Sequence, residues 1–432
     1  MKKPVGVRWL FTLIITFLFF GWATTGVLIY IRLFLVVSLM LLGSYLWNLV
    51  ALKGIRVTRR SRSLRTSVGK VFDERYDIQN VSRWSCMWLE IENLSQIPQK
   101  SGSRLLTSIG GLQQRSYTAR TWITKRGAYP LGPTMLTSGD PFGFFASSRL
   151  DPAENTLIVL PLAVDIPYFP APEGILTGGK EVHQKTMDVT PHATGVREYV
   201  PGDPIKRVHW PSTAKRDHFM VKTYEQDPQA EVWFFLDSEK KAQFSLPESE
   251  NEAREDYLNI NRRSQIKLPK DTYEYAISAT ASLARYFLQQ KRAVGFVSSG
   301  SQFTVIPSER GERQIGKILE TLAFLQPDGE LPLLGCVSLH AKYLPMGSGG
   351  ILVTPSLNND LLITVEYLNH RHLHPMVVSI LPETFGGPSG GEDIYEGLER
   401  RKVPVFKVAC GEDLSRQLGQ IKGINKRTWS ST

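Results

Sequence analysis

The chain has 432 residues, of which 42% are hydrophobic and 21% charged, so it can bury the cores of two or three domains and is not mainly disordered. Three scattered cysteines exclude a disulfide framework and a four-cysteine zinc site. The net charge of +10 arises within residues 1–70, with 11 Lys and Arg and no acidic residue, whereas the other 362 residues carry 40 basic and 41 acidic side chains, which disfavours general polyanion binding.

Residues 9–31 and 33–52 are two uncharged apolar segments separated by one arginine. A single helix over both would be about 66 Å long, twice the roughly 30 Å of a hydrocarbon core, so we expect a transmembrane helical hairpin within residues 1–54. Its turn fits either residues 21–26 or residues 30–32. Basic residues flank both outer ends, and the positive-inside rule places both ends in the cytosol. A second apolar run disfavours a cleavable signal peptide.

Three further regions follow along the chain. Residues 55–165 alternate polar and apolar side chains between turn clusters, which predicts a β-rich, sandwich-like domain. Residues 166–225 are a connector rich in Pro, Gly and His. In residues 226–432 short apolar strands alternate with helices, which predicts a mostly parallel, doubly wound α/β sheet, interrupted at residues 245–269 by a charged loop. The expected strands are 232–236, 293–298, 302–307, 351–353, 376–381 and 403–408, and the expected helices are 273–290, 312–325, 357–369 and 394–401.

Two motifs that suggest chemistry are incomplete. Residues 174–181 nearly match a phosphate-binding P-loop, but Glu181 stands where a hydroxyl must hold Mg²⁺. The imidazoles of His370, His372 and His374 could bind zinc, but no HExxH pattern and no fourth ligand accompany them. No nucleophile elbow is present. The sequence therefore predicts no catalytic residue and no cofactor.

The densest unusual segment is GVREYVPGDPIKRVHW, with further basic and aromatic residues after it. A Pro-Gly-Asp turn lies in its middle. Arg pairs bidentately with carboxylates and stacks on rings, so we expect a structural clamp that fixes the orientation of two modules. RNA binding would use similar groups, but acidic residues interrupt the positive field. The expected structural or interaction residues are Arg197, Glu198, Tyr199, Pro201, Gly202, Asp203, Arg207, Trp210, Lys215, Arg216 and Lys222.

This segment resembles the signature of the DUF58 family, which precedes the first strand of a von Willebrand factor A-like domain. The residues just named match that signature in order, together with Gly195, Ala214 and Val221. Upstream, KRGAYPLGP and DPFGFF are similar to the family's RGxYxLGP and DPFG segments, and the N-terminal helix pair is typical of it. His209 stands where Asp is common, so the chain resembles a divergent member. The resemblance implies a von Willebrand factor A-like fold for residues 226–432.

Domains of this kind often hold Mg²⁺ through a D-x-S-x-S motif after the first strand, because hard oxygen ligands suit that ion. Asp237 matches the first position, but Glu239 and Lys241 replace the two serines, and an ammonium group cannot coordinate a cation. Thr354 is followed by Pro355, where an Asp would give support. We expect a degenerate site in which Asp237 is a weak metal candidate and caps the strand end.

These features favour a membrane-anchored adapter or maturation factor over an enzyme. The resemblance implies work by protein–protein interaction with client proteins and a MoxR-type AAA+ ATPase, because family members are commonly linked with such ATPases. The expected location is the cell membrane, with residues 9–52 in the bilayer and the other domains in the cytoplasm. One alternative is a metal-dependent enzyme that uses Asp237 and the cluster of His370, His372 and His374. Nucleic-acid binding, which would depend steeply on salt, is not expected.

Overall fold

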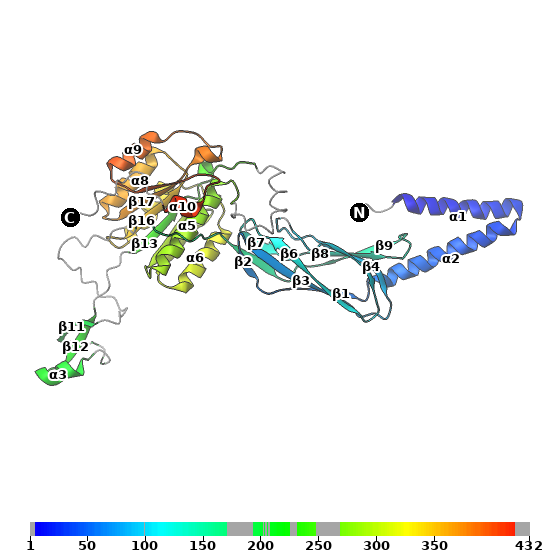
Figure 1. Cartoon of the computed structure of the whole chain (residues 1–432), viewed down its shortest axis with the longest axis horizontal. Helices are drawn as coiled ribbons and strands as arrows, with labels where there is room; N and C mark the ends of the chain where they lie inside the picture. Colours follow the sequence, from blue (N-terminus) through cyan, green and yellow to red (C-terminus); the bar gives the residue numbers. More distant parts are fainter. Residues whose placement is uncertain are drawn as a thin grey trace. The chain divides into compact units, whose positions relative to one another are not determined.

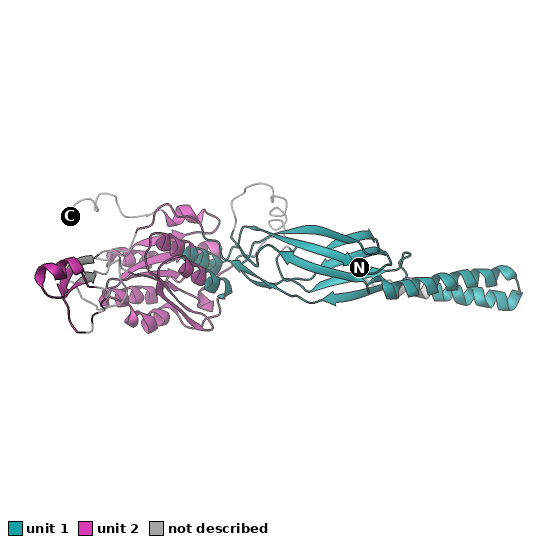
Figure 2. Ribbon diagram, turned by 90° about the horizontal axis from the view of Figure 1, so that it is seen from below, with its two compact units in different colours: residues 1–163, 246–281, 319–325 teal, residues 164–245, 282–318, 326–432 magenta. Residues whose placement is uncertain are grey.

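The structure is a computed structural model that divides into two compact units (Figure 2). Unit 1 comprises residues 1–163, 246–281 and 319–325, and unit 2 comprises the rest. The P-loop-like residues 174–181 and most of the expected charged loop lie outside the residues that the structure describes. The described residues are 5–98, 100–170, 193–201, 203, 205, 208–224, 231–247 and 268–419.

Unit 1 begins with two apolar helices, α1 (Val5–Thr25) and α2 (Leu28–Ala51) (Figure 1). The chain turns between them after Gly26, whose φ of +67° suits glycine. The ring of Phe19 on α1 packs against Phe34 on α2, with 5.9 Å between centroids. By length and composition α2 can cross a membrane, and α1 contains a shorter apolar stretch, so one or two N-terminal helices suit a bilayer.

The next part of unit 1 consists of strands, as the alternating pattern predicts. On β3 every second side chain is buried, including Phe72, Tyr76 and Ile78, because successive residues of a strand face opposite sides. The sheets have the orders β1-β3-β6, β2-β10-β7 and β5-β4-β8-β9. The strands are β1 (Ile55–Ser61), β2 (Arg65–Ser67), β3 (Val71–Asn80), β4 (Cys86–Asn93), β5 (Arg104–Ile109), β6 (Gln114–Trp122), β7 (Gly127–Pro130), β8 (Thr134–Gly139), β9 (Ala146–Asp151) and β10 (Thr156–Leu160).

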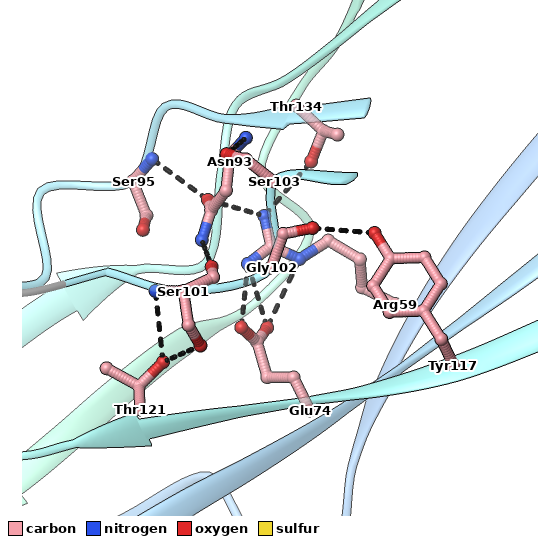
Figure 3. A network of polar contacts seen from close by, with 10 residues as sticks. All are labelled: Arg59, Glu74, Asn93, Ser95, Ser101, Gly102, Ser103, Tyr117, Thr121 and Thr134. Carbon is pink, nitrogen blue, oxygen red and sulfur yellow. Dashed lines mark hydrogen bonds and ion pairs between the residues drawn. The ribbon is translucent and has the colours of Figure 1, made fainter. Parts of the chain in front are cut away.

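A buried ion pair ties these strands together (Figure 3). Arg59 of β1 binds both carboxylate oxygens of Glu74 on β3, with Nη2 at 2.8 and 3.0 Å. Its Nη1 donates to Asn93 Oδ1 at 3.2 Å and to Thr134 Oγ1 at 3.0 Å. Burial raises the pKa of Glu74, although the guanidinium opposes that shift. The pair is largely enclosed, and both side chains have partners, so its role is structural.

Unit 2 contains a mixed six-stranded sheet of order β15-β14-β13-β16-β17-β18 (Figure 1). All neighbouring pairs are parallel except β14 and β15, so β15 is an antiparallel edge strand. The mixed α/β class is as expected. The strands are β13 (Val232–Leu236), β14 (Val294–Ser299), β15 (Phe303–Glu309), β16 (Gly349–Thr354), β17 (His374–Ile380) and β18 (Val405–Val408).

Helices alternate with these strands along the chain. The four predicted helices are confirmed as α5 (Thr272–Gln289), α6 (Glu312–Phe324), α8 (Asn359–His370) and α9 (Glu392–Arg400). Two short helices were not predicted, α7 (Leu333–His340) and α10 (Leu414–Leu418). The side chains that α7 contributes to the core include Leu333, Cys336 and Val337.

Candidate functional site

The strand order of unit 2 places a topological switch between β13 and β16. The chain builds outward from β13 through β14 to β15, and then returns to the other side of β13 with β16. In open parallel sheets, ligands bind outside the carboxyl ends of the strands at such a switch. Asp237 directly follows β13, and Thr354 ends β16. Their side chains meet at this edge.

The carboxylate of Asp237 is buried and fully engaged. Thr354 Oγ1 donates to its Oδ2 at 2.6 Å, and Ser356 Oγ donates to the same oxygen at 3.3 Å. The backbone N–H of Glu239 donates to Oδ1 at 3.1 Å. Burial raises the pKa of Asp237, and these hydrogen bonds oppose the shift. The geometry is that of a side chain that caps the strand end and joins two loops.

A cleft of about 270 Å³ lies at the same edge of the sheet. Its lining includes Lys241, Phe244 and Ser356, and the chain around it is rich in Pro and Gly. Asp237 is not among the lining residues, and Lys241 contributes a cation to the cleft. A cleft lined in this way offers a metal ion no carboxylate ligand.

The histidine cluster lies at the other end of the parallel strands, where their amino ends meet. His374 begins β17 and pairs with Gly349, which also pairs with Val232 at the start of β13, five residues before Asp237. Within the part of the chain that the structure describes, no group of three or more His, Cys, Asp and Glu could hold a metal ion. The site that combined Asp237 with His370, His372 and His374 is therefore not assembled, because parallel strands separate their amino and carboxyl ends.

The signature segment folds into a small module, which we call the signature module and define by its described residues, 193–201, 203, 205 and 208–224. Strand β11 (Ala193–Glu198) pairs antiparallel with β12 (Met220–Tyr224), and helix α3 (Trp210–Arg216) lies between them in the chain. Thr213 Oγ1 accepts from Met220 N at 3.0 Å, which joins the helix to β12. The helix ends at Asp217 in the left-handed conformation, with φ +56°.

An ion pair fixes the turn of the signature module. Arg197 donates to both carboxylate oxygens of Asp203, at 2.8 and 2.7 Å. Asp203 Oδ2 also accepts from the backbone N–H of Val200 at 3.0 Å. The bidentate pairing expected for Arg197 is therefore present, but its partner lies within the module.

For Trp210 the clamp between two modules stays a prediction, and the structure shows a ring contact within the signature module. The side chain of Trp210 is 61% exposed, and its ring touches Phe219 edge to face with 6.4 Å between centroids. The ring of Tyr199 contacts the same phenylalanine, with 6.1 Å between centroids. Large apolar side chains thus face outward from a turn held by its own hydrogen bonds. The exposed apolar residues of the module are Val196, Val200, Ile205, Trp210 and Phe219.

The other predicted signature residues have different positions. Glu198 and Pro201 are exposed, and Lys215 and Arg216 are exposed in the last turn of α3. Gly202, Arg207 and the side chain of Lys222 lie outside the described residues. Phe219 and Ile205 were not predicted from the sequence, although a large apolar residue within a polar segment is a usable signal. Ser356 was not predicted either, because its role depends on β13 and β16 being neighbours.

Comparisons with known proteins support the signature. The family model described as "Protein of unknown function DUF58" matches residues 195–258. The "Uncharacterized protein YeaD" of Bacillus subtilis (strain 168) is 22% identical over 302 residues, which are 67% of this chain. The chain covers 65% of that relative's length.

The similarity to solved structures is weak. The CARDB domain of the PF1109 protein from Pyrococcus furiosus is 11% identical, with a TM-score of 0.18, over 24% of this chain and 91% of that one. A beta-glucosidase from Listeria innocua is 9% identical, with a TM-score of 0.15, over 24% of this chain and 16% of that one. TM-scores this low carry no argument about fold or function. The signature match and the distant relative together support the resemblance to the DUF58 family, as a divergent member.

Proposed function

We propose that the protein is a membrane-anchored adapter that works by protein–protein interaction at the cytoplasmic face, with a MoxR-type AAA+ ATPase as its partner. The observation that carries this proposal is the exposed apolar face of the signature module. Ile205, Trp210 and Phe219 are each more than half exposed. Contiguous exposed apolar side chains of this size typically mark interaction surfaces, and Trp is enriched among the residues that dominate binding energy.

The rigidity of the signature module supports a binding role. The ion pair of Arg197 with Asp203 holds the turn, so little ordering entropy is lost when a partner binds. Helix α3 begins with Trp210, and Lys215 and Arg216 lie in its last turn. We therefore expect the partner surface to be apolar at its centre and acidic at its rim.

The sheet of unit 2 supports a von Willebrand factor A-like assignment without its metal chemistry. Its strand order is a known order of doubly wound sheets, the class that the resemblance implies for residues 226–432. The oxygens of Asp237 are already engaged by Thr354 and Ser356, and Lys241 stands where a serine ligand is needed. These features favour an adapter over a metal-dependent enzyme.

The membrane part of the proposal rests on α1 and α2. Both are apolar, the turn at Gly26 brings their outer ends to one side, and the flanking charges are basic. By the positive-inside rule these outer ends face the cytoplasm, with the chain after α2 on that side.

Site-specific photo-crosslinking tests the proposal. The full chain carries p-benzoylphenylalanine at Trp210 or, as a control, at Tyr343, which is also exposed in unit 2. It is reconstituted in nanodiscs and mixed with a purified MoxR-type AAA+ ATPase from the same organism. We expect a crosslinked product from position 210 and none from position 343, and Ile205→Ser should weaken it. Equal products at both positions, or none, contradict the proposal.

A further inference from the structure

Three loops of unit 1 carry exposed apolar side chains at one end of the strands. Leu112 is 71% exposed, Trp84 66% and Phe142 62%. Each lies in a connection between strands that follow one another in the chain: β5–β6 and β3–β4, which join two sheets, and β8–β9, which joins two paired strands. Single exposed apolar residues are ordinary, but three on neighbouring loops form a patch. We call these three connections the tip loops and define them as residues 81–85, 110–113 and 140–145.

The tip loops lie next to the connection between α2 and β1. The backbone N–H of Val81 donates to Gly54 O, just after α2, at 2.8 Å. The N–H of Leu112 donates to Ser82 O at 2.9 Å, which joins the second loop to the first. The end of the strands that carries the apolar side chains is therefore the end next to the apolar helices.

Aromatic contacts join the same loops to both helices. A tryptophan of α2 meets the tryptophan of the first loop, and the third loop contacts α1 and α2. These contacts continue the apolar surface of the helices onto the loops. The ring pairs, with the distances between centroids, are Trp47–Trp84 at 6.4 Å, Tyr45–Phe145 at 5.7 Å and Phe11–Phe144 at 4.6 Å.

Buried polar side chains hold the loops rigidly. Asp140 accepts from the backbone N–H of Phe142 at 2.9 Å and of Phe145 at 2.6 Å. Asn80 donates to the carbonyl of Trp84 at 2.8 Å. The second loop holds Leu112 at φ +58°, a left-handed conformation that is unfavourable for a leucine. The side chain is nevertheless exposed, so burial within the protein does not offset that cost.

The charges around the patch suit an anionic surface. Lys53 and Arg83 are exposed, and residues 80–85 and 110–115 contain no Asp or Glu. The one acidic residue of the third loop, Asp140, is buried against backbone N–H groups. Aromatic side chains next to Lys and Arg are typical of the boundary between hydrocarbon and headgroups.

We infer that the tip loops insert into the interface of the bilayer that α2 crosses. Trp84, Leu112 and Phe142 enter the boundary with the acyl chains, and Lys53 and Arg83 bind anionic headgroups. This inference rests on the membrane anchor of the proposed function. It adds a second point of attachment, which fixes how the strand-rich region is held at the membrane.

Quenching by brominated lipid tests the insertion. The full chain with Cys410→Ser carries a bimane label at Leu112→Cys or, as a control, at Leu64→Cys. The native Cys86 and Cys336 are buried and so protected from labelling. Leu64 is also exposed but lies beyond the far end of β1, about 20 Å away at 3.3 Å per residue. The vesicles contain phosphatidylcholine and phosphatidylglycerol with bromine on the acyl chains.

We expect loss of bimane emission at position 112 and unchanged emission at position 64. Lys53→Ala with Arg83→Ala, or vesicles of phosphatidylcholine alone, should reduce that loss. Equal emission at both positions in a chain that floats with the vesicles overturns the insertion and leaves the anchor intact. A chain that does not float with the vesicles overturns the anchor and, with it, the insertion.

Discussion

Arg126 forms an ion pair with Glu274 in unit 1 while its own side chain is only 3% exposed. The same guanidinium donates to the carbonyls of Leu322, at 2.9 Å, and Leu325, at 2.7 Å, at the C-terminal end of α6. A cation there satisfies carbonyl groups that have no partner within the helix. Arg126 belongs to the KRGAYPLGP segment that the sequence comparison singled out, and the structure assigns it this capping role.

The Arg126→Ala variant should lose about 3–5 kcal/mol of unfolding free energy, because it leaves a largely buried carboxylate without its partner. Chemical denaturation of the full chain in detergent, followed by circular dichroism, measures this loss. Arg65→Ala is the matched control, because the Arg65 side chain is 65% exposed in its pair with Glu320 and a pair with an exposed partner is worth about 1 kcal/mol or less. Equal losses in the two variants would contradict the capping role.

Asp237 should give stability a measurable pH dependence. Because burial raises its pKa, the folded state keeps a proton at pH values where the unfolded state has released it. This contribution to stability is present at acid pH and is lost as the pH rises through the raised pKa. The unfolding midpoint of the wild type minus that of Asp237→Asn should therefore grow as the pH falls from about 7 to about 4.

Scanning fluorimetry over a pH series measures this difference. The control is Asp360→Asn, which removes an exposed carboxylate from the first turn of α8. A difference for Asp237→Asn that stays constant with pH would show that the folded and unfolded states titrate alike at this position.

Removing one partner of the pair of Arg59 and Glu74 should lower the free energy of unfolding strongly, whereas replacing both partners by apolar residues should lower it little. Arg59→Ala leaves the buried Glu74 unpaired and should cost about 3–5 kcal/mol. Arg59→Met with Glu74→Leu removes both charges and should recover most of that loss. Denaturant midpoints of the single and double variants measure the coupling. Additive losses would argue that the two charges act independently.

Trp210→Ala should leave stability nearly unchanged, because the side chain is mostly exposed. It should abolish crosslinking of the neighbouring position Phe219, labelled with p-benzoylphenylalanine, to the ATPase. Trp233→Ala is the control for the same truncation in a buried strand, with an expected cost of about 3–5 kcal/mol. A comparable fall in melting temperature for both variants would mean that Trp210 packs against the protein in solution.

The sequence predicted most of the sheet in unit 2 because its strands are short, continuous apolar runs. Val232–Leu236 is buried at every position, and such a run between helical patterns indicates a covered strand. It did not predict α7, whose sequence LLGCVSLH is apolar on nearly every side and lacks a helical period. A helix without a polar face cannot be distinguished by periodicity alone.

The signature module was predicted as an irregular connector because its order arises from specific pairs. Arg197 and Asp203 are six residues apart, and no periodic pattern indicates that they meet. For the same reason the sequence did not predict the contact of Ser356 with Asp237, which lies 119 positions earlier in the chain. Contacts between distant residues require the strand order, which composition and spacing do not supply.

The antiparallel edge strand β15 limits how the protein can associate. Edge strands offer unpaired backbone groups to other chains. The exposed apolar side chains of Phe303 and Val305 on this strand would favour such pairing. Pro307 interrupts the strand, however, and its nitrogen carries no hydrogen to donate. The register with β14 also shifts beside Pro307, and an irregularity of this kind at an edge disfavours regular pairing with the strand of another molecule.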